Sequence, residues 1–251
     1  IYRELRRKNK LMHAYLVEKD KMLGLVAHDL KSPISGVRMI GEFISSSYQQ
    51  LGPEMMYELG NDIKSSTSRM FDTISNLLEI QELEAGKQKP LLKKMDLTDA
   101  LRSSVAQYTE KALLKGIVIC EDYPSTPCIV NLDHMYCVRI VKNLLSNAIK
   151  YSPHHETVSV ELNVIMSTSS RKGKKARIAV KDHGPGILAD EMPKLFKKFT
   201  KLSARPTGGE HSSGIGLSIV KQMVESQGGK VFCESVPEQG ATFIVEFPMS
   251  H

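Results

Sequence analysis

The chain has 251 residues, of which 41% are hydrophobic and 25% charged, a composition typical of a globular protein with one or two domains. Its formal net charge is +6, but the basic residues are scattered and not interleaved with aromatic residues, which argues against a nucleic-acid-binding protein. No apolar run approaches the ~18–20 residues that span a bilayer, so the sequence predicts no transmembrane helix.

The cysteines and the start of the chain indicate the compartment. The cysteines, which have no CxxC spacing, are Cys120, Cys128, Cys137 and Cys233. We expect them to be small buried side chains in a reduced cytoplasm, forming neither a zinc site nor disulfides. Because the sequence begins at Ile1 without a signal peptide, we expect a cytoplasmic part of a longer protein, with an upstream sensor domain or membrane anchor absent from this sequence.

Residues 1–46 are predicted to form one long helix. Its apolar residues recur at spacings of seven and four, and they are Leu5, Met12, Leu16, Leu23 and Leu30. This pattern is typical of a coiled-coil seam. A helix of this length cannot bury such a stripe alone, so we expect a partner helix. Pro33 removes a backbone donor and should bend the helix.

His28 and Asp29 occupy a special place on this helix. Each residue advances roughly 100° around a helix axis. On that wheel the apolar residues of one side are Leu23, Val26, Leu30, Pro33, Val37, Ile40 and Ile44. His28 lies almost opposite, near Ser32, so we expect it to face water or a partner. A lone His-Asp pair is more often a solvated surface histidine, and a functional interpretation therefore depends on the rest of the chain.

Residues 54–84 are predicted to form a second helix, with apolar residues at spacings of three, four and seven. The polar, Gly-Pro-containing segment 48–53 would connect the two helices into a hairpin. Two helices supply too little core, so we expect the hairpin to dimerise into a four-helix bundle. Residues 85–90 have the composition of a linker, and the first domain is therefore predicted to span residues 1–90.

The segment 91–251 mixes strands with helices and is predicted to be a second domain, a two-layer α/β sandwich. Helices are expected from Asp96 to about Leu114, from Asp133 to about Tyr151, over 190–196 and over 215–227. Strands are expected over 117–120, 128–130, 158–166, 177–181, 230–234 and 241–247. Residues 167–175 should form a hairpin loop, and the Gly- and Ser-rich residues 203–213 a flexible lid.

The helix ending near Tyr151 carries a polar face. Asn143, Asn147, Lys150 and Tyr151 follow one another at helical spacing and share this face, while the apolar Leu144, Leu145 and Ala148 take the other. Amide oxygens and an ammonium group on one face can hold Mg²⁺ together with a triphosphate. The alternative is an ordinary polar helix face in water.

Two glycine-containing segments follow. Asp182-His183-Gly184-Pro185-Gly186 comes after a predicted strand, where a buried carboxylate could accept hydrogen bonds from an exocyclic amine. By itself this segment is more often a plain Gly-Pro turn. Gly214-Ile215-Gly216-Leu217 opens a predicted helix, whose free amides would suit phosphate. The chain has no GxxxxGK[ST] segment, so a Walker A loop is excluded.

In this order, the motifs resemble those of bacterial-type sensor histidine kinases with a HisKA dimerisation domain and a HATPase_c catalytic domain, across nearly the whole chain. The segment His28-Asp29-Leu30-Lys31-Ser32-Pro33 resembles the phosphoacceptor H-box, and residues 143–151 resemble the N-box. Residues 182–186, 196–199 and 214–216 resemble the G1, F and G2 boxes. The resemblance implies a Bergerat-type ATP fold, shared with gyrase, Hsp90 and MutL proteins.

The resemblance also implies site residues. His28 would be phosphorylated, Asp29 would orient and activate its ring, and Ser32 takes the position where phosphatase-active relatives often have Thr or Asn. The residues implied to bind ATP are Asn143, Asn147, Lys150, Tyr151, Asp182, Gly184, Gly186, Lys201, Gly214, Gly216 and Leu217. Among them Asn147 would bind Mg²⁺ and Asp182 would recognise the adenine amino group. Lys201 stands where many members have a phosphate-contacting arginine, and Ser212 where the G2 box often has its first glycine.

The implied function is an ATP-dependent protein-histidine kinase of two-component signal transduction. It would act as a homodimer and pass the phosphoryl group from histidine to an aspartate of a response-regulator receiver domain. Two alternatives belong to other classes: a Bergerat-fold ATPase or clamp that uses ATP for closure, and a degenerate kinase that serves as a non-catalytic scaffold. The H-box argues against the first, and the presence of His28, Asn147 and Asp182 argues against the second.

Overall fold

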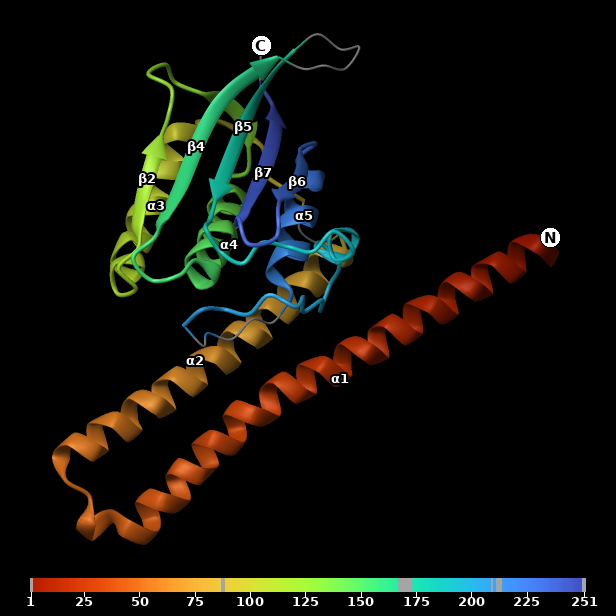
Figure 1. Cartoon of the computed structure of the whole chain (residues 1–251). Coiled ribbons are helices and arrows are strands. Elements are labelled where there is room, and N and C mark those ends of the chain that lie inside the picture. Colours follow the sequence, from red (N-terminus) through yellow and green to blue (C-terminus); the bar gives the residue numbers. More distant parts are fainter. Residues whose placement is uncertain (1, 87–88, 167–172, 209, 211–213, 250–251) are drawn as a thin grey trace. The chain divides into compact units, whose positions relative to one another are not determined.

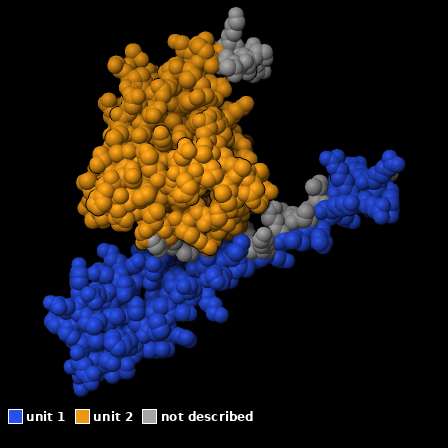
Figure 2. Space-filling model, in the orientation of Figure 1, with its two compact units in different colours: residues 1–81 blue, residues 82–251 orange. Residues whose placement is uncertain are grey.

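The computed structural model describes residues 2–86, 89–166, 173–208, 210 and 214–249. The chain divides into two compact units, Ile1–Gln81 and Glu82–His251, and each is described here by itself (Figure 2). Among the described residues, no helix is long and apolar enough to cross a membrane.

Unit 1 is a pair of long helices, as predicted. Helix α1 spans Tyr2–Ser47 and continues through Pro33, a short 3₁₀ turn η1 covers Tyr48–Gln50, and helix α2 spans Pro53–Glu84 (Figure 1). Pro53 suits the first helical position because its missing N–H would be unpaired there in any case. The predicted seam residues Leu5, Met12 and Leu16 are 57%, 60% and 50% exposed, so a single chain leaves this stripe uncovered.

The predicted wheel is largely confirmed. Val26 is buried, and the apolar residues that follow it on the same side are partly buried; they are Leu30, Pro33, Val37, Ile40 and Ile44. His28 and Ser32 are exposed, as expected for the opposite face. Leu23, on the same side, is 50% exposed, like Leu16 of the predicted seam.

Unit 2 is a two-layer α/β sandwich, which confirms the predicted fold class. Its five-stranded sheet has the order β2-β4-β5-β7-β6, with β2 parallel to β4 and all other neighbours antiparallel. The strands are β2 Val118–Asp122, β4 Thr157–Met166, β5 Lys174–Lys181, β6 Lys230–Ser235 and β7 Ala241–Pro248. Helices α3 Leu97–Leu113, α4 His134–Tyr151 and α5 Gly216–Ser226 form the second layer (Figure 1).

The core of unit 2 lies between these layers. The strands supply it through alternate residues, such as Val158, Val160 and Leu162 on β4, each at most 1% exposed. Helix α4 supplies its apolar face; Leu144, Leu145 and Ala148 are fully buried. Burial of that face forces the opposite, polar face of α4 toward the rim of the domain, where a ligand can reach it.

Several sequence predictions need correction. Strand β1, Lys93–Asp96, which pairs with β3, Ile129–Leu132, was not predicted, because its lysines lack strand character. The expected helix 190–196 is only the 3₁₀ turn η2, Met192–Lys194, within other turns. Cys120 is exposed because β2 is an edge strand, Cys128 and Cys137 are buried, and all four thiols are free. Most of the predicted hairpin loop, 167–172, and residues 209 and 211–213 of the predicted lid lie outside the described residues.

Candidate active site

The His28 side chain stands free on α1 with a carboxylate beside it. It is 81% exposed, and its Nδ1 lies 3.5 Å from Oδ1 of Asp29, whose side chain is only 8% exposed. At this distance the contact is weak in the resting protein. An acceptor at Nδ1 favours the tautomer with the proton on Nδ1, which leaves Nε2 with its lone pair directed away from Asp29. The pair can therefore present a nucleophilic nitrogen to an outside reactant.

Helix α4 carries the polar face predicted to hold a triphosphate. The helix starts at Asp133, whose Oδ1 accepts a hydrogen bond from the Tyr136 amide at 3.1 Å. Asn143 donates from Nδ2 to the Arg139 carbonyl at 3.0 Å, and its Oδ1 lies only 2.7 Å from the point where a Cβ on Gly216 would stand. The fold therefore brings the start of α5 against this face, and a side chain at Gly216 would displace the Asn143 amide.

Asn147 lies one turn further along α4. Its side chain is partly buried, and no hydrogen bond to it from the described residues is present. Lys150 and Tyr151 are also partly buried and lie at the end of the same face. An amide oxygen without a hydrogen-bond partner among the described residues, on a polar helix face, is the kind of ligand that a hard divalent cation such as Mg²⁺ prefers.

Asp182 follows β5 and is buried, with 4% of its surface exposed. Its Oδ1 accepts hydrogen bonds from the amides of Gly184 at 2.9 Å and Ala241 at 3.1 Å. Burial raises the pKa of this carboxyl above its ordinary value, although both amides and the nearby His183 act to lower the pKa. Since both bonds use Oδ1, Oδ2 has no hydrogen bond from the described residues and can accept one from a ligand.

The glycines predicted near Asp182 permit close packing of the loop. A Cβ on Gly184 would lie 2.9 Å from the Tyr151 carbonyl oxygen. Gly186 has φ +69°, and a Cβ there would lie 2.3 Å from the Val236 carbonyl oxygen. The loop therefore packs against the end of α4 on one side and the β6–β7 turn on the other, which brings Asp182 and Tyr151 into one site.

The β6–β7 turn is a functional element that sequence reasoning missed. Gly240 has φ +81°, and a Cβ on it would lie 2.1 Å from the Asp182 carbonyl oxygen. Ser235 Oγ accepts a hydrogen bond from the Ile187 amide at 2.9 Å and donates one to the Gly240 carbonyl at 2.7 Å. A lone glycine before the last strand was the only available signal, and by itself it indicates no more than a turn.

The remaining predicted site residues lie around the start of α5. Gly214 has φ +67°, and a Cβ there would lie 2.7 Å from the Thr200 carbonyl oxygen, so the predicted F and G2 boxes meet. The amide end of α5 has no side-chain cap, and Gly216 and Leu217 form its first turn. Lys201 is exposed.

Among the described residues, no cluster of three or more His, Cys, Asp or Glu side chains could hold a metal ion.

Comparison with known proteins agrees with this geometry. Residues 18–86 match the family model described as "His Kinase A (phospho-acceptor) domain", HisKA. Residues 133–251 match the model HATPase_c, described as "Histidine kinase-, DNA gyrase B-, and HSP90-like ATPase". The HisKA match contains His28, and the HATPase_c match contains Asn147 and Asp182.

Individual relatives match most of the length of this chain. The sensor-like histidine kinase SenX3 of Mycolicibacterium smegmatis is 29% identical over 226 residues, which cover 89% of this chain and 56% of that protein. The non-motile and phage-resistance protein of Caulobacter vibrioides is 26% identical over 234 residues, which cover 93% of this chain and 27% of that protein. The chain thus spans between about a quarter and somewhat more than half of these relatives.

Solved structures give the same result for the fold. The mycobacterial sensor histidine kinase MprB is 27% identical with a TM-score of 0.53, and the match covers 63% of this chain and 98% of that one. The histidine kinase ThkA, solved in complex with the response regulator protein TrrA, has a TM-score of 0.70 at 24% identity, and the match covers 95% of this chain and 64% of that one. With a HisKA region that contains an exposed histidine, followed by a HATPase_c region on a two-layer sandwich, this chain belongs to the sensor histidine kinases.

Proposed function

We propose that this chain is the kinase core of a two-component sensor, which transfers the γ-phosphoryl group of ATP to His28 and then to an aspartate of a response-regulator receiver domain. The observation that carries the proposal is the exposed His28 ring with the buried Asp29 carboxylate at its Nδ1. A Bergerat-fold ATPase that uses ATP only for closure has no need of this pair.

The proposed phosphoryl transfer is an in-line displacement. Nε2 of His28 attacks the γ-phosphorus, the bond from that phosphorus to the bridging oxygen breaks, and ADP leaves. The Asp29 carboxylate accepts the hydrogen bond from Nδ1–H, which keeps the proton off the attacking nitrogen. Since such transition states are loose, the protein contributes mainly positioning and charge neutralisation.

ATP would be held by the polar rim of unit 2. Asp182 Oδ2 would accept from the exocyclic amino group of adenine, and Lys150 and Tyr151 would contact phosphate and ribose or base. Asn143 and the first amides of α5, at Gly216 and Leu217, would line the triphosphate. Mg²⁺ bound at Asn147 would neutralise the phosphate oxygens. Gly184, Gly186 and Gly214 would allow backbone to approach the nucleotide, and Lys201 would supply a positive charge.

The uncovered stripes of α1 and α2 support a homodimer with a four-helix bundle. Leu5, Met12 and Leu16 are at least half exposed in a single chain, and Phe71 on α2 is 72% exposed. Contiguous exposed apolar residues of this extent mark an interface. We divide the chain into a dimerising domain, residues 1–90, and an ATP-binding domain, residues 91–251. The first fragment should be a helical dimer by light scattering and the second an ATP-binding monomer; a monomeric first fragment would contradict the bundle.

The partner of the phosphorylated protein is a response-regulator receiver. The related ThkA has been solved in a complex with a response regulator protein, which makes the same kind of partner the natural choice here. No nucleic-acid partner is proposed, because the basic residues are not interleaved with aromatic residues in the sequence. A cytoplasmic location, where ATP and receivers occur, follows from this assignment.

The decisive experiment follows the label from γ-³²P-ATP. Wild-type protein should acquire label that is labile in acid and stable in alkali, as a phosphoramidate is. His28→Gln should lose the label and retain ATP binding. His13→Gln is the matched control, because His13 is also exposed on α1 but has no acidic neighbour, and it should label normally. Acid-stable label, or full labelling of His28→Gln, would contradict the proposal and favour a plain ATPase.

A further inference from the structure

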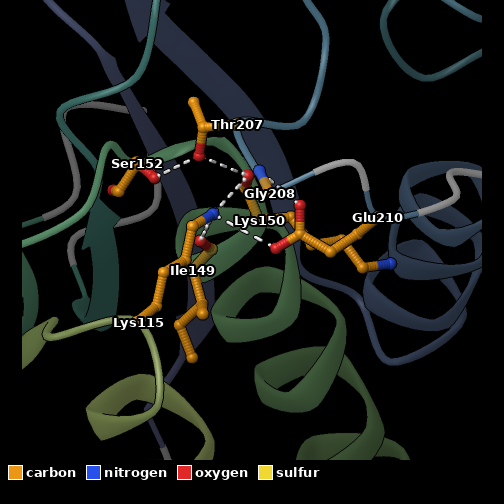
Figure 3. A network of polar contacts seen from close by, with 7 residues as sticks. All are labelled: Lys115, Ile149, Lys150, Ser152, Thr207, Gly208 and Glu210. Carbon is orange, nitrogen blue, oxygen red and sulfur yellow. Dashed lines mark hydrogen bonds and ion pairs between the residues drawn. The ribbon is translucent and has the colours of Figure 1, made fainter. Parts of the chain in front are cut away.

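Lys115, in the turn between α3 and β2, is the buried lysine to which no role has been given above. Only 7% of its surface is exposed. Its Nζ donates to the carbonyls of Ile149 at 2.9 Å and Lys150 at 3.0 Å, and forms an ion pair with Oε1 of Glu210 at 3.1 Å (Figure 3). Lysines are almost never buried without partners, and this one uses three acceptors that lie far from it in sequence.

The two carbonyls belong to the end of α4. The last four carbonyls of a helix have no partner within the helix, and this end carries partial negative charge. The Lys115 ammonium satisfies two of them and is favourably placed against that charge. Since Lys150 and Tyr151 occupy this last turn, Lys115 fixes the backbone from which two proposed ATP-binding side chains extend.

The third partner, Glu210, is close in sequence to Thr207, which also bonds to the end of α4. Thr207 donates from its amide to the Lys150 carbonyl at 3.0 Å and from its hydroxyl to the Ser152 carbonyl at 2.6 Å (Figure 3). Glu210 accepts from the Gly208 amide at 2.9 Å with its other oxygen, Oε2.

Glu210 is held in its charged form. Burial acts to raise the pKa of its carboxyl, but hydrogen bonds and the Lys115 ammonium outweigh burial, so the pKa lies below its ordinary value. Lys115, Thr207 and Glu210 are called the Lys115 clamp below. The clamp thus combines the Lys115–Glu210 ion pair with hydrogen bonds to the backbone carbonyls at the end of α4.

We propose that Lys115 is a positioning residue for the nucleotide site, acting through the clamp to hold Thr207 and Glu210 on the end of α4 before ATP arrives. The proposal rests on the ATP-binding function proposed above. Ordering of a loop on binding reduces affinity, so a loop that is already anchored leaves more of the contact energy for the nucleotide. Lys115 itself touches neither substrate nor the reacting atoms.

The test uses the whole chain and four variants. Lys115→Met removes the ammonium and keeps a long side chain. Glu210→Gln removes the negative charge and one of the two acceptor oxygens, and the double variant combines both changes. Lys111→Met is the matched control, because Lys111 is an exposed lysine near the end of α3, one helical turn before Lys115 in the sequence. Two quantities are measured: hydrogen exchange of the Thr207 amide without nucleotide, and the Kd for a fluorescent ATP analogue with Mg²⁺.

Lys115→Met should accelerate Thr207 exchange and raise the Kd about tenfold, and Glu210→Gln should raise the Kd by a smaller factor, about threefold. The double variant should be no weaker than Lys115→Met, because the two residues act through one contact. Lys111→Met should match wild type in both quantities. If Lys115→Met does not fold, Glu210→Gln decides, since its change lies at the partly exposed end of the pair.

Contrary results are separable. If Lys115→Met and Glu210→Gln fold and bind the ATP analogue with the wild-type Kd, Lys115 is merely structural. Additive increases in Kd in the double variant would also contradict the proposal, because they would mean that the two residues do not act through one contact. Wild-type chain that binds no nucleotide would refute the proposed function. Unchanged Thr207 exchange in Lys115→Met would refute the clamp on its own, whether or not ATP binds.

Discussion

Replacing Gly240 by alanine tests whether the β6–β7 turn holds Asp182 in place. Gly240 has φ +81°, and an added Cβ would lie 2.1 Å from the Asp182 carbonyl oxygen, roughly 1.3 Å short of an ordinary contact at 3.4 Å. Gly228 is the matched control, because it has a similar φ of +74° but nothing within 4 Å of an added Cβ. Both variants suffer the strain of a left-handed alanine, and only Gly240→Ala suffers the overlap.

The expected magnitudes follow from these contacts. A left-handed alanine costs about 1–2 kcal/mol, which is the whole expected loss for Gly228→Ala. Gly240→Ala must also displace the backbone at Asp182, where the Asp182 amide donates to Ala241 at 2.9 Å and the Ala241 amide donates to Asp182 Oδ1 at 3.1 Å. Weakening these two bonds adds about 2–3 kcal/mol, for a total of about 3–5 kcal/mol.

The assay is hydrogen exchange at the slowest amides of β5 and β7, which reports the free energy of unfolding of unit 2 alone. Binding of an ATP analogue is the second measurement. Gly240→Ala should weaken that binding because Asp182 is displaced, whereas Gly228→Ala should not. Equal losses of stability in the two variants, or unchanged nucleotide affinity in Gly240→Ala, would refute the reasoning.

Two further substitutions probe buried carboxylates. Asp182→Asn should weaken ATP binding about 10- to 150-fold through loss of a charge-assisted hydrogen bond, and reduce discrimination against GTP. The same change should leave stability at neutral pH unchanged or higher, because burial raises the Asp182 pKa and disfavours the charged form in the folded protein. Calorimetry measures both the ATP affinity and the thermal stability of the variant. Unchanged ATP affinity would remove Asp182 as the adenine-binding residue. Burial acts to raise the pKa of Glu246, but Lys175 and Arg177 bind its carboxylate and lower the pKa below its ordinary value. The stabilising contribution of Glu246 is therefore present above the pKa of an unfolded glutamate and is lost as pH falls through the lower folded value. Glu246→Gln should reduce the free energy of unfolding by about 1–3 kcal/mol at pH 7 and flatten its acid dependence in unfolding titrations. A variant with an unaltered acid dependence would contradict this role of Glu246.

The helices could be predicted because their signals are local. The periodicity of α4, together with Asp133 at its start, identified both its buried face and its polar face. The exposure of His28 followed from helical geometry in the same way. Leu23 shows the limit of such reasoning, since a stripe of apolar residues does not reveal whether the covering surface comes from the same chain.

The surroundings of the site could not be predicted, because they depend on contacts between distant segments. Asp182 was identified as a candidate, but one of its two amide donors, Ala241, lies 59 residues further along the chain. Lys115 was missed because two of its three acceptors are backbone carbonyls, 34 and 35 residues away, and any residue type supplies a carbonyl. The sheet order, on which both contacts depend, is a property of the whole fold.

The position of β5 has a consequence for regulation. This strand is paired along most of its length with β4 on one side and β7 on the other, and Asp182 directly follows its last residue. Strands held on both sides open only when the whole domain unfolds, whereas peripheral loops and helix ends open locally and often. The proposed adenine contact is thus attached to the part of unit 2 that fluctuates least. A signal that tunes nucleotide affinity in this protein must therefore act at the periphery of the site and leave the base-reading strand unchanged.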